Sequence, residues 1–420
     1  MAEEFSDLTK CMSKLLDKKT KQSTGFFATP NSIISELLSH IIKLENPVNF
    51  NRILEPSAGT LAFVQWLDKS PLWPKNHQCI IDAVEKSTIL YNSIKDVKVD
   101  NFALNIINED FIKYNVDMEI KYDLIIANPP YLIISKDVIP KEYIEYMVGR
   151  ANLYCLFILH SLKMLKSNGF LAFIIPKSFM NSLYYSKIRN YLMTQGDILH
   201  ILDFESDSEK YQYIDTKQAT IGFIFQKKTP SANSKYALKI GDSNDYIFTS
   251  DLNAMRQYLE NTTTISKLGL KVKTGNIVWN QHKPKLTDDS TKPILIYNSN
   301  ITADNKILPR VFSNKEKKQY IKGIVDSNKQ PAILVNRGNG NTAYKLTFAE
   351  VNLNSPPINY FIENHLNVIY APEDNEKNRE LLNLVLNSLK NKKTIEFINM
   401  FCGNGGLSKT ELETMLPIWI

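Results

Sequence analysis

The sequence predicts an α/β fold, with a mostly parallel sheet covered by helices on both faces and a mixed α/β domain after it. In the first 230 residues, short apolar segments alternate with segments that repeat apolar side chains at helical period. Segment 122–127 is apolar at almost every position, which is typical of a strand buried on both faces. After about residue 260 the segments become shorter and less regular. Because 420 residues is long for one core, we expect two domains, residues 1–260 and 261–420.

The period of the apolar side chains predicts the individual elements. The first helix covers 31–44, and Asn31 or Thr29 is expected to cap it, with Pro30 close to its first turn. Strands are predicted at 52–54, 79–84, 103–107, 122–127, 169–175, 198–204 and 220–225. Further helices are predicted around 63–67 and at 153–165, 186–193, 378–390 and 394–401.

Composition and charge restrict the class of protein. Hydrophobic residues make up 43% of the chain and charged residues 22%, as in ordinary globular proteins. The net charge of +6 is compatible with a polyanionic partner without requiring one. The four cysteines are far apart and form no cluster with histidines, so we expect neither a metal site nor a disulfide framework. The N-terminus does not resemble a signal peptide and no apolar stretch is long enough to span a membrane, so we expect a cytoplasmic protein.

Residues suited to ligand binding follow three of the predicted strands. Glu55-Pro56-Ser57-Ala58-Gly59-Thr60 joins a strand to a helix, and its small side chains let the backbone approach a ligand. Glu85 ends the next strand, where a carboxylate suits the two hydroxyls of a ribose. Asp110 and Phe111 follow the third strand. A carboxylate there can accept a hydrogen bond from the exocyclic amine of a bound adenine, while the Phe111 ring packs on the face of that base. Each signal is weak alone, but these ends should meet at one edge of a parallel sheet.

A fourth strand ends at the same edge in Asn128-Pro129-Pro130-Tyr131. Neither proline has an N–H, so neither can extend the sheet. The Asn128 amide oxygen and the Pro129 carbonyl can accept two hydrogen bonds from one exocyclic NH2 group. Tyr131 can stack on the ring that carries this group. The four residues therefore suit the methylation of a planar amine.

In this order the motifs resemble those of the gamma (TaqI-like) class of S-adenosylmethionine-dependent DNA adenine-N6 methyltransferases of restriction-modification systems. Gly25-Phe26-Phe27-Ala28-Thr29-Pro30 looks like the N-terminal cofactor motif of that family. It precedes the glycine turn, and this order separates the gamma class from its permuted relatives. The resemblance implies a Rossmann-like methyltransferase core, S-adenosylmethionine as cofactor and double-stranded DNA as partner, without a metal.

The resemblance also implies roles for single residues. Thr29 would contact the methionine end of the cofactor, Glu85 its ribose, and Asp110 with Phe111 its adenine. The full set of implied cofactor contacts is Thr29, Glu55, Pro56, Ser57, Ala58, Gly59, Glu85, Asp110, Phe111 and Asn128. The family often carries a further glycine after Gly59-Thr60, where this chain has Leu61. The Leu61 side chain must point away from the cofactor, or the affinity for the cofactor would be low.

The target base would be an adenine flipped out of the duplex. Asn128 and the Pro129 carbonyl would accept the hydrogens of its N6 amine, and Tyr131 would stack on its ring. In the family an aromatic residue just before the strand at 220–225 covers the other face. Tyr213 is the best match, and Tyr211 competes with it. Transfer would be direct, without a general base.

The C-terminal half resembles the target-recognition domain of the family more loosely, at 332–338 and 407–417. Arg337 is expected to pair with guanine, and Asn339 or Asn341 with adenine. Phosphate contacts are expected from Lys271, Lys273, Lys315, Lys317 and Lys318.

Other interpretations stay open at this point. Asn-Pro-Pro-Tyr also occurs in glutamine-N5 methyltransferases of release factors and in some rRNA methyltransferases. A degenerate, non-catalytic DNA-binding subunit is a third interpretation. Cytosine-N4 transfer is a fourth, although those enzymes usually carry Ser where Asn128 stands. We expect a prokaryotic monomer associated with the nucleoid, with a separate cognate restriction endonuclease as an optional partner.

Overall fold

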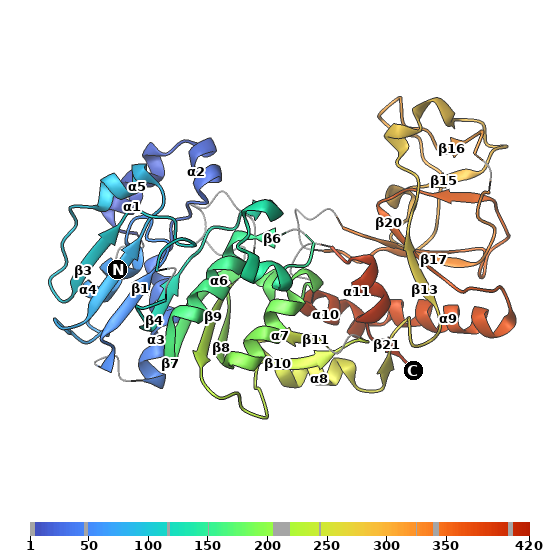
Figure 1. The fold of residues 1–420 in the computed structure, drawn as a ribbon. Helices are drawn as coiled ribbons and strands as arrows, with labels where there is room; N and C mark the ends of the chain where they lie inside the picture. Colours follow the sequence, from blue (N-terminus) through green and yellow to red (C-terminus); the bar gives the residue numbers. More distant parts are fainter. Residues whose placement is uncertain are drawn as a thin grey trace. The chain divides into compact units, whose positions relative to one another are not determined.

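The computed structural model describes residues 5–45, 49–115, 118–149, 151–204, 219–242, 245–324, 326–338, 344–401 and 406–420. The chain divides into two compact units, one formed by residues 1–238 and 245–252 and the other by residues 239–244 and 253–420 (Figure 1).

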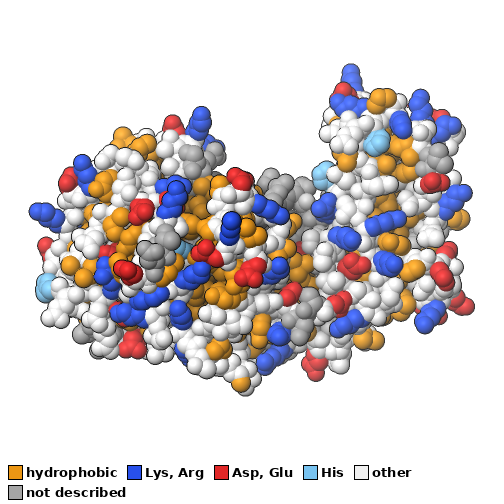
Figure 2. Space-filling model, in the orientation of Figure 1, with side chains coloured by type: hydrophobic (Ala, Val, Ile, Leu, Met, Phe, Trp, Pro, Cys, Tyr) orange, Lys and Arg blue, Asp and Glu red, His pale blue; other side chains and the backbone are white. Residues whose placement is uncertain are grey.

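In the part that the structure describes, no helix is both long and apolar enough to cross a membrane. On the face drawn in Figure 2, Lys and Arg side chains are spread over the surface with Asp and Glu between them.

A seven-stranded sheet with the order β3-β2-β1-β4-β7-β9-β8 forms the centre of the first unit. Its strands are β1 (Arg52–Glu55), β2 (Ile80–Val84), β3 (Ala103–Ile107), β4 (Tyr122–Ala127), β7 (Leu165–Pro176), β8 (Gly196–Phe204) and β9 (Thr220–Lys227). The pairs β1–β2, β1–β4, β2–β3 and β4–β7 are parallel, whereas β9 runs antiparallel to both β7 and β8. The predicted α/β fold with a mostly parallel sheet is therefore confirmed.

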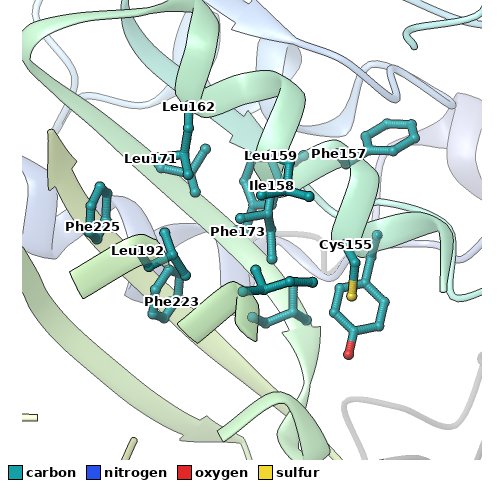
Figure 3. Close-up of a cluster of buried hydrophobic side chains, with 14 of the residues drawn as sticks. Cys155, Phe157, Ile158, Leu159, Leu162, Leu171, Phe173, Leu192, Phe223 and Phe225 are labelled. Atoms are coloured by element: carbon teal, nitrogen blue, oxygen red, sulfur yellow. The ribbon is translucent and has the colours of Figure 1, made fainter. Parts of the chain in front are cut away.

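Successive strand residues face opposite sides of this sheet and enter two separate apolar clusters. Ile53 lies in one cluster and Leu54 in the other, and Ile126 and Ile125 divide in the same way. One face is covered by α3 (Asn31–Leu44) and α4 (Ala62–Lys69), and the other by α6 (Leu153–Met164) and α7 (Ser186–Gln195). Figure 3 shows side chains of α6 and α7 packed on those of β7 and β9.

A buried polar network crosses the four strands that lead to the predicted site. Asp82 on β2 is 1% exposed and accepts hydrogen bonds from Arg52 Nε on β1 (2.8 Å) and from the Tyr122 hydroxyl on β4 (2.8 Å). Asn105 Nδ2 on β3 donates to the other oxygen of Asp82 at 2.9 Å. Because an unpaired charge at this depth is costly, the network fixes the alignment of these strands.

The segment before the sheet is helical. It contains α1 (Asp7–Leu15) and α2 (Lys18–Thr24), which Ser6 and Asp17 cap through their side chains. Gly25 ends α2 in the left-handed conformation (φ 67°). The expected cap of α3 is wrong, since Pro30 occupies the N-cap position without a side-chain bond and Asn31 is already helical. Thr29 has a different partner, described below. Smaller elements of this unit are α5 (Thr88–Ile94), β5 (Ile133–Ile134), β6 (Ala151–Asn152) and β11 (Asp245–Phe248), which pairs with β10 (Ala237–Ile240).

The second unit contains two four-stranded sheets, ordered β13-β20-β17-β18 and β14-β16-β15-β19. They pack on each other through one apolar cluster, to which Ile296, Leu334 and Val368 belong. The strands are β12 (Thr262–Thr263), β13 (Lys271–Thr274), β14 (Leu286–Thr287), β15 (Ile294–Ile296), β16 (Tyr320–Ile321), β17 (Ala332–Asn336), β18 (Phe348–Val351), β19 (Tyr360–Ile362), β20 (Leu366–Tyr370) and β21 (Ile418–Trp419). The helices are α8 (Leu252–Leu259), α9 (Glu376–Lys390), α10 (Lys392–Phe401) and α11 (Lys409–Thr414). The expected mixed α/β second part is confirmed.

Candidate functional site

The loops that follow β1, β2 and β3 are joined to one another at the carboxyl edge of the large sheet. Ala58 N–H donates to the Val84 carbonyl at 3.0 Å, and Glu85 N–H donates to the Ile107 carbonyl at 2.9 Å. Gly59 N–H donates to Glu85 Oε2 at 2.8 Å. The turn after β1 and the acidic residue after β2, predicted as separate signals, therefore form one connected structure.

Leu61 points away from this turn. Its side chain is fully buried in the apolar cluster that also contains Ile53 and Val64. Its backbone is left-handed, with φ 58°, a conformation that costs a non-glycine residue about 1–2 kcal/mol. Burial of a leucine side chain contributes about as much in the opposite direction. Leu61, where the family often has glycine, therefore does not obstruct the side of the turn at which the cofactor is predicted to bind.

Glu55 lies beneath the turn. It is 2% exposed, and its carboxyl group accepts hydrogen bonds from the N–H groups of Phe63 and Val64 at the start of α4. Its Oε2 is buried and has no hydrogen-bond partner among the described residues. Burial raises the pKa of Glu55 well above its ordinary value, and nearby Glu85 reinforces this shift. A buried acceptor with spare capacity therefore lies under the predicted cofactor turn.

Glu85 is 8% exposed and accepts backbone hydrogen bonds from the N–H groups of Gly59, Ser87 (2.7 Å to Oε1) and Lys86. Burial raises the pKa of Glu85, while these hydrogen bonds oppose that effect. A carboxylate has about four lone-pair sites, so some capacity remains for a ligand. This capacity suits a hydroxyl of a ribose.

Asp110 and Phe111 lie in the turn after β3. Asp110 Oδ1 accepts Ile112 N–H at 3.1 Å, and Asp110 Oδ2 forms an ion pair with Lys86 Nζ at 2.8 Å. The Phe111 ring is 2% exposed and packs against Phe157, with ring centroids 4.7 Å apart. The carboxylate is thus accessible, whereas most of the ring belongs to the core.

His160 of α6 supports this turn from behind, a role that no signal in the sequence indicates. Its imidazole is 3% exposed and lies edge-on to Phe111, with centroids 5.0 Å apart. Nε2 lies 3.0 Å from the Tyr114 carbonyl, which only accepts, so Nε2 carries the hydrogen and Nδ1 accepts the Tyr143 hydroxyl at 2.9 Å. Burial lowers the pKa of His160, and the bond to Tyr114 opposes the shift. The neutral ring satisfies both of its neighbours.

The residues after β4 are bonded to the N-terminal motif. Asn128 Nδ2 donates to Thr29 Oγ1 at 3.0 Å, and Ser57 Oγ donates to the Asn128 carbonyl at 3.2 Å. The Tyr131 hydroxyl lies 2.8 Å from Asn128 Oδ1 and 3.0 Å from the Ile174 carbonyl. Because one hydroxyl hydrogen cannot fully satisfy two acceptors, Asn128 Oδ1 keeps the capacity to accept another donor.

Gly25 and Phe27 explain how the N-terminal motif reaches this loop. A Cβ atom at Gly25 would lie 2.4 Å from Pro130 Cβ, so only glycine permits the close approach. The Phe27 ring stacks on Tyr131, with centroids 5.7 Å apart and planes inclined by 26°. The motif was visible in the sequence, but these contacts across about a hundred residues were not.

The helix α1 also reaches the glycine turn. Thr9 is 1% exposed, and its hydroxyl lies 2.7 Å from that of Thr60, which is 3% exposed. Met12 of α1 and its C-cap residue Leu16 pack with Phe26 and Leu90 in a small apolar cluster. Residues ahead of the N-terminal motif thus contribute to the wall of the site.

Several predicted DNA contacts in the second unit already have partners within the chain. Lys317 Nζ lies over the rings of Tyr297 (4.1 Å), Phe312 (4.8 Å) and Trp279 (5.8 Å). Lys273 Nζ lies over the Tyr370 ring at 4.8 Å. The remaining lysines of this set are Lys271, Lys315 and Lys318, of which Lys318 pairs with Asp288. Arg337 is exposed at the end of β17.

Four other predicted residues fall outside the described part of the chain, namely Tyr211, Tyr213, Asn339 and Asn341. Their roles stay predictions. Across the described ranges, no group of three or more His, Cys, Asp or Glu side chains is arranged to hold a metal ion.

Comparison with known proteins identifies relatives of the chain. Residues 14–211 match the model of the Eco57I restriction-modification methylase family. Modification methylase CviBIII of Paramecium bursaria Chlorella virus NC1A is 27% identical over 98% of this chain and 98% of its own length. Type II methyltransferase M.CvrRI of Paramecium bursaria Chlorella virus XZ-6E is 26% identical over 96% of this chain and 97% of its own. The predicted resemblance to restriction-modification methyltransferases is therefore confirmed, while the gamma class stays a prediction.

Solved structures are more distant. The type IIG restriction endonuclease BpuSI covers 98% of this chain and 61% of its own, with 11% identity and a TM-score of 0.46. A putative class I S-adenosylmethionine-dependent methyltransferase from Listeria monocytogenes covers 54% of this chain and 68% of its own, with 16% identity and a TM-score of 0.37. At these scores the likeness adds nothing to the fold described above.

Proposed function

We propose that this relative of the restriction-modification methyltransferases transfers a methyl group from S-adenosylmethionine to the N6 amine of an adenine in double-stranded DNA. The observation that carries the proposal is the environment of Asn128. Its amide nitrogen is held by Thr29, and its oxygen faces a hydroxyl that it shares with a second acceptor. An acceptor of this kind, followed directly by the Pro129 carbonyl, suits an incoming NH2 group.

The residues around the glycine turn fit the cofactor. Glu85 keeps lone-pair capacity for a ribose hydroxyl, and Asp110 presents an accessible carboxylate for an adenine amine. The unpartnered Glu55 Oε2 would be satisfied by a donor such as the ammonium group at the methionine end. Thr29 Oγ1 accepts from Asn128 and keeps its own hydrogen to donate. When bound, S-adenosylmethionine supplies a methyl group on a positively charged sulfur.

In this proposal Asn128 and Pro129 act on the nucleophile. The N6 lone pair of adenine is delocalised into the ring, which makes the amine a poor nucleophile. Two acceptors on its hydrogens favour a pyramidal nitrogen and direct the lone pair toward the methyl group. These residues contribute positioning and electrostatic stabilisation. The amine would lose its extra proton to water during or after transfer, so no side chain has to act as a general base.

The target base must leave the duplex, because a paired adenine cannot reach such a pocket. Tyr131 would then stack on the base, with Phe27 supporting the tyrosine ring from the other side. One aromatic stack on a base is worth about 1–3 kcal/mol, comparable to part of the unstacking cost. We assign the second face of the base to Tyr213, with Tyr211 as the competitor.

The second unit would recognise the DNA sequence, in a gamma-class enzyme that acts as a monomer beside an optional separate endonuclease. The buried orientation of Leu61 removes the main reason to favour a degenerate, non-catalytic subunit. Two relatives that span almost the whole chain are a modification methylase and a type II methyltransferase, which supports DNA rather than rRNA or a release factor as the substrate.

The test supplies S-adenosylmethionine with a labelled methyl group to the full-length chain in three parallel reactions. The acceptors are unmethylated genomic DNA, rRNA and a release factor. We expect label in DNA, recovered as N6-methyladenine after nucleoside analysis. Label in rRNA or in the release factor would instead support the rival enzymes. DNA binding without any transfer would support the non-catalytic subunit.

A further inference from the structure

Arg337 and the turn Glu363–His365 meet at one end of the sheet β13-β20-β17-β18. The strand β17 ends just before Arg337, and β20 begins just after His365 in antiparallel register. Arg337 N–H donates to the His365 carbonyl at 3.1 Å, and Arg337 Nη1 donates to the Asn364 carbonyl at 3.0 Å. Arg337 and His365 are therefore neighbours across the two strands, and both side chains are exposed.

A buried carboxylate orients His365. Glu363 is 3% exposed, and His365 Nδ1 lies 2.8 and 2.9 Å from its two oxygens. His365 N–H donates to the same carboxylate at 3.0 Å. Because a carboxylate only accepts, Nδ1 carries a hydrogen. Nε2 has no hydrogen-bond partner within the described ranges, and 61% of the side chain is exposed.

The backbone beneath these side chains is fixed. A Cβ atom at Gly275, just after β13, would lie 2.2 Å from the Glu363 carbonyl oxygen, so the two segments touch backbone to backbone. Gly275 N–H donates to the Leu366 carbonyl at 2.9 Å. Asn367 is fully buried and its Nδ2 donates to the Leu407 carbonyl at 3.1 Å. The turn is therefore ordered before any ligand arrives, which lowers the entropic cost of binding through it.

We propose that Arg337 and His365 form a base-reading pair, in which Arg337 binds a guanine and His365 contacts the same or the adjacent base pair. This inference rests on the proposed function and deepens it. Arg337 spends one of its five donors on Asn364, which fixes the plane of a guanidinium whose other donors match guanine O6 and N7. Glu363 favours a base edge over a phosphate as the partner, because its negative charge beside the pair would repel phosphate.

The test compares Arg337→Lys and His365→Gln with the wild-type full-length chain. Lysine keeps the charge of Arg337 but loses the planar fork. Lys377→Gln is the matched control, because Lys377 is exposed and lies near the opposite end of the same sheet. Its neighbour Asn378, at the start of α9, lines a small pocket together with Pro331 and Ala371 from that end. Each protein methylates unmethylated genomic DNA in a limiting reaction, and the methylated positions are mapped. Thermal unfolding confirms that each variant is folded.

We expect Arg337→Lys to lose about tenfold or more of its discrimination at one base pair of the recognised sequence. His365→Gln should relax the same or the adjacent position, and Lys377→Gln should leave the pattern unchanged.

A uniform loss of methylation over all sites, without relaxation at any single base pair, would indicate that Arg337 does not read a base and would overturn the inference. An unchanged pattern in both variants would also overturn it, while leaving the proposed function intact. A wild-type chain that methylates no DNA would overturn the proposed function, and this inference with it.

Discussion

The polar residues at the sheet edge of the first unit bond to one another, whereas those at the sheet end of the second unit point outward. Asn128 is held by Thr29 and faces the Tyr131 hydroxyl. In the second unit, Glu363 holds His365 from behind and leaves most of its side chain exposed. A site for chemistry needs its groups fixed and shielded from water, while a recognition surface needs a fixed backbone and accessible side-chain atoms. If this difference holds, methyl transfer and cofactor binding should be sensitive to the loss of single contacts at the sheet edge of the first unit.

The largest effect is expected from Gly25→Ala. Its new Cβ would collide with Pro130 and displace the loop that carries Asn128. A displacement of about 1 Å near reacting atoms costs about a hundredfold in rate, so kcat/KM for methyl transfer should fall at least that far.

Gly269→Ala is the control, since Gly269 is also left-handed (φ 79°) but has nothing within 4 Å of the new Cβ. It should lose only about 1–2 kcal/mol of stability, measured by urea unfolding. Equal activities of the two variants would contradict the proposed packing.

Glu85→Gln should weaken cofactor binding by about tenfold to a hundredfold, because hydrogen bonds to a charged group are worth about 1.5–3 kcal/mol. The amide nitrogen of glutamine cannot accept the N–H of Gly59 or Ser87. Calorimetric titration with S-adenosylmethionine measures the Kd, with Glu380→Gln on the exposed face of α9 as the control. An unchanged Kd would show that Glu85 only supports the turn.

Tyr131→Phe should strengthen binding of an extruded base by about two- to tenfold. The ring and its stacking on Phe27 remain, while Asn128 Oδ1 loses a competing donor worth about 0.5–1.5 kcal/mol. Fluorescence of 2-aminopurine at the target position reports extrusion. Weaker extrusion in the variant would mean that the hydroxyl assists the base instead of competing with it.

The smallest effect concerns pH. Burial lowers the pKa of His160 below its ordinary value of 6.5, so protons favour the unfolded chain. Its contribution to stability is therefore complete above about pH 6.5 and is lost as the pH falls toward the lowered value. His160→Gln should flatten the dependence of Tm on pH between 7.5 and 5.5. His40 and His200, whose pKa values are also lowered by burial, remain in the variant and serve as the internal reference. An unchanged slope would contradict the neutral, doubly bonded imidazole.

The sequence predicted the first unit well, because apolar periods and strand-end motifs are local signals. The strand 122–127 and the helix 31–44 have the predicted bounds. The expected cap of that helix is wrong because Thr29 bonds to Asn128, 99 residues away. The position of the Leu61 side chain also depends on a backbone angle that no pattern encodes. The contacts of the predicted site residues with cofactor and target base stay predictions, as does the cofactor itself.

The second unit was harder to predict. Its strands are two to five residues long, too short to show a clear period, and the arrangement of its two sheets was not predicted. Arg337 is a candidate in the sequence because it lies in segment 332–338, which resembles part of the target-recognition domain of the family. Glu363 and His365 gave no signal, because their importance arises only where β20 pairs with β17. Recognition residues of this kind depend on contacts between strands and not on a motif.

The most direct test of the central claim is to compare wild-type protein with Asn128→Ala in two measurements on the same preparations. One is the Kd for S-adenosylmethionine, and the other is the amount of N6-methyladenine formed in DNA at saturating cofactor. We predict a loss of N6-methyladenine of at least about a thousandfold at saturating cofactor, much larger than any rise in the Kd, because removal of one preorganised acceptor costs about 10²–10³ in rate and its positioning role adds to this. N6-methyladenine formed by the variant at a rate close to that of the wild type would contradict the account.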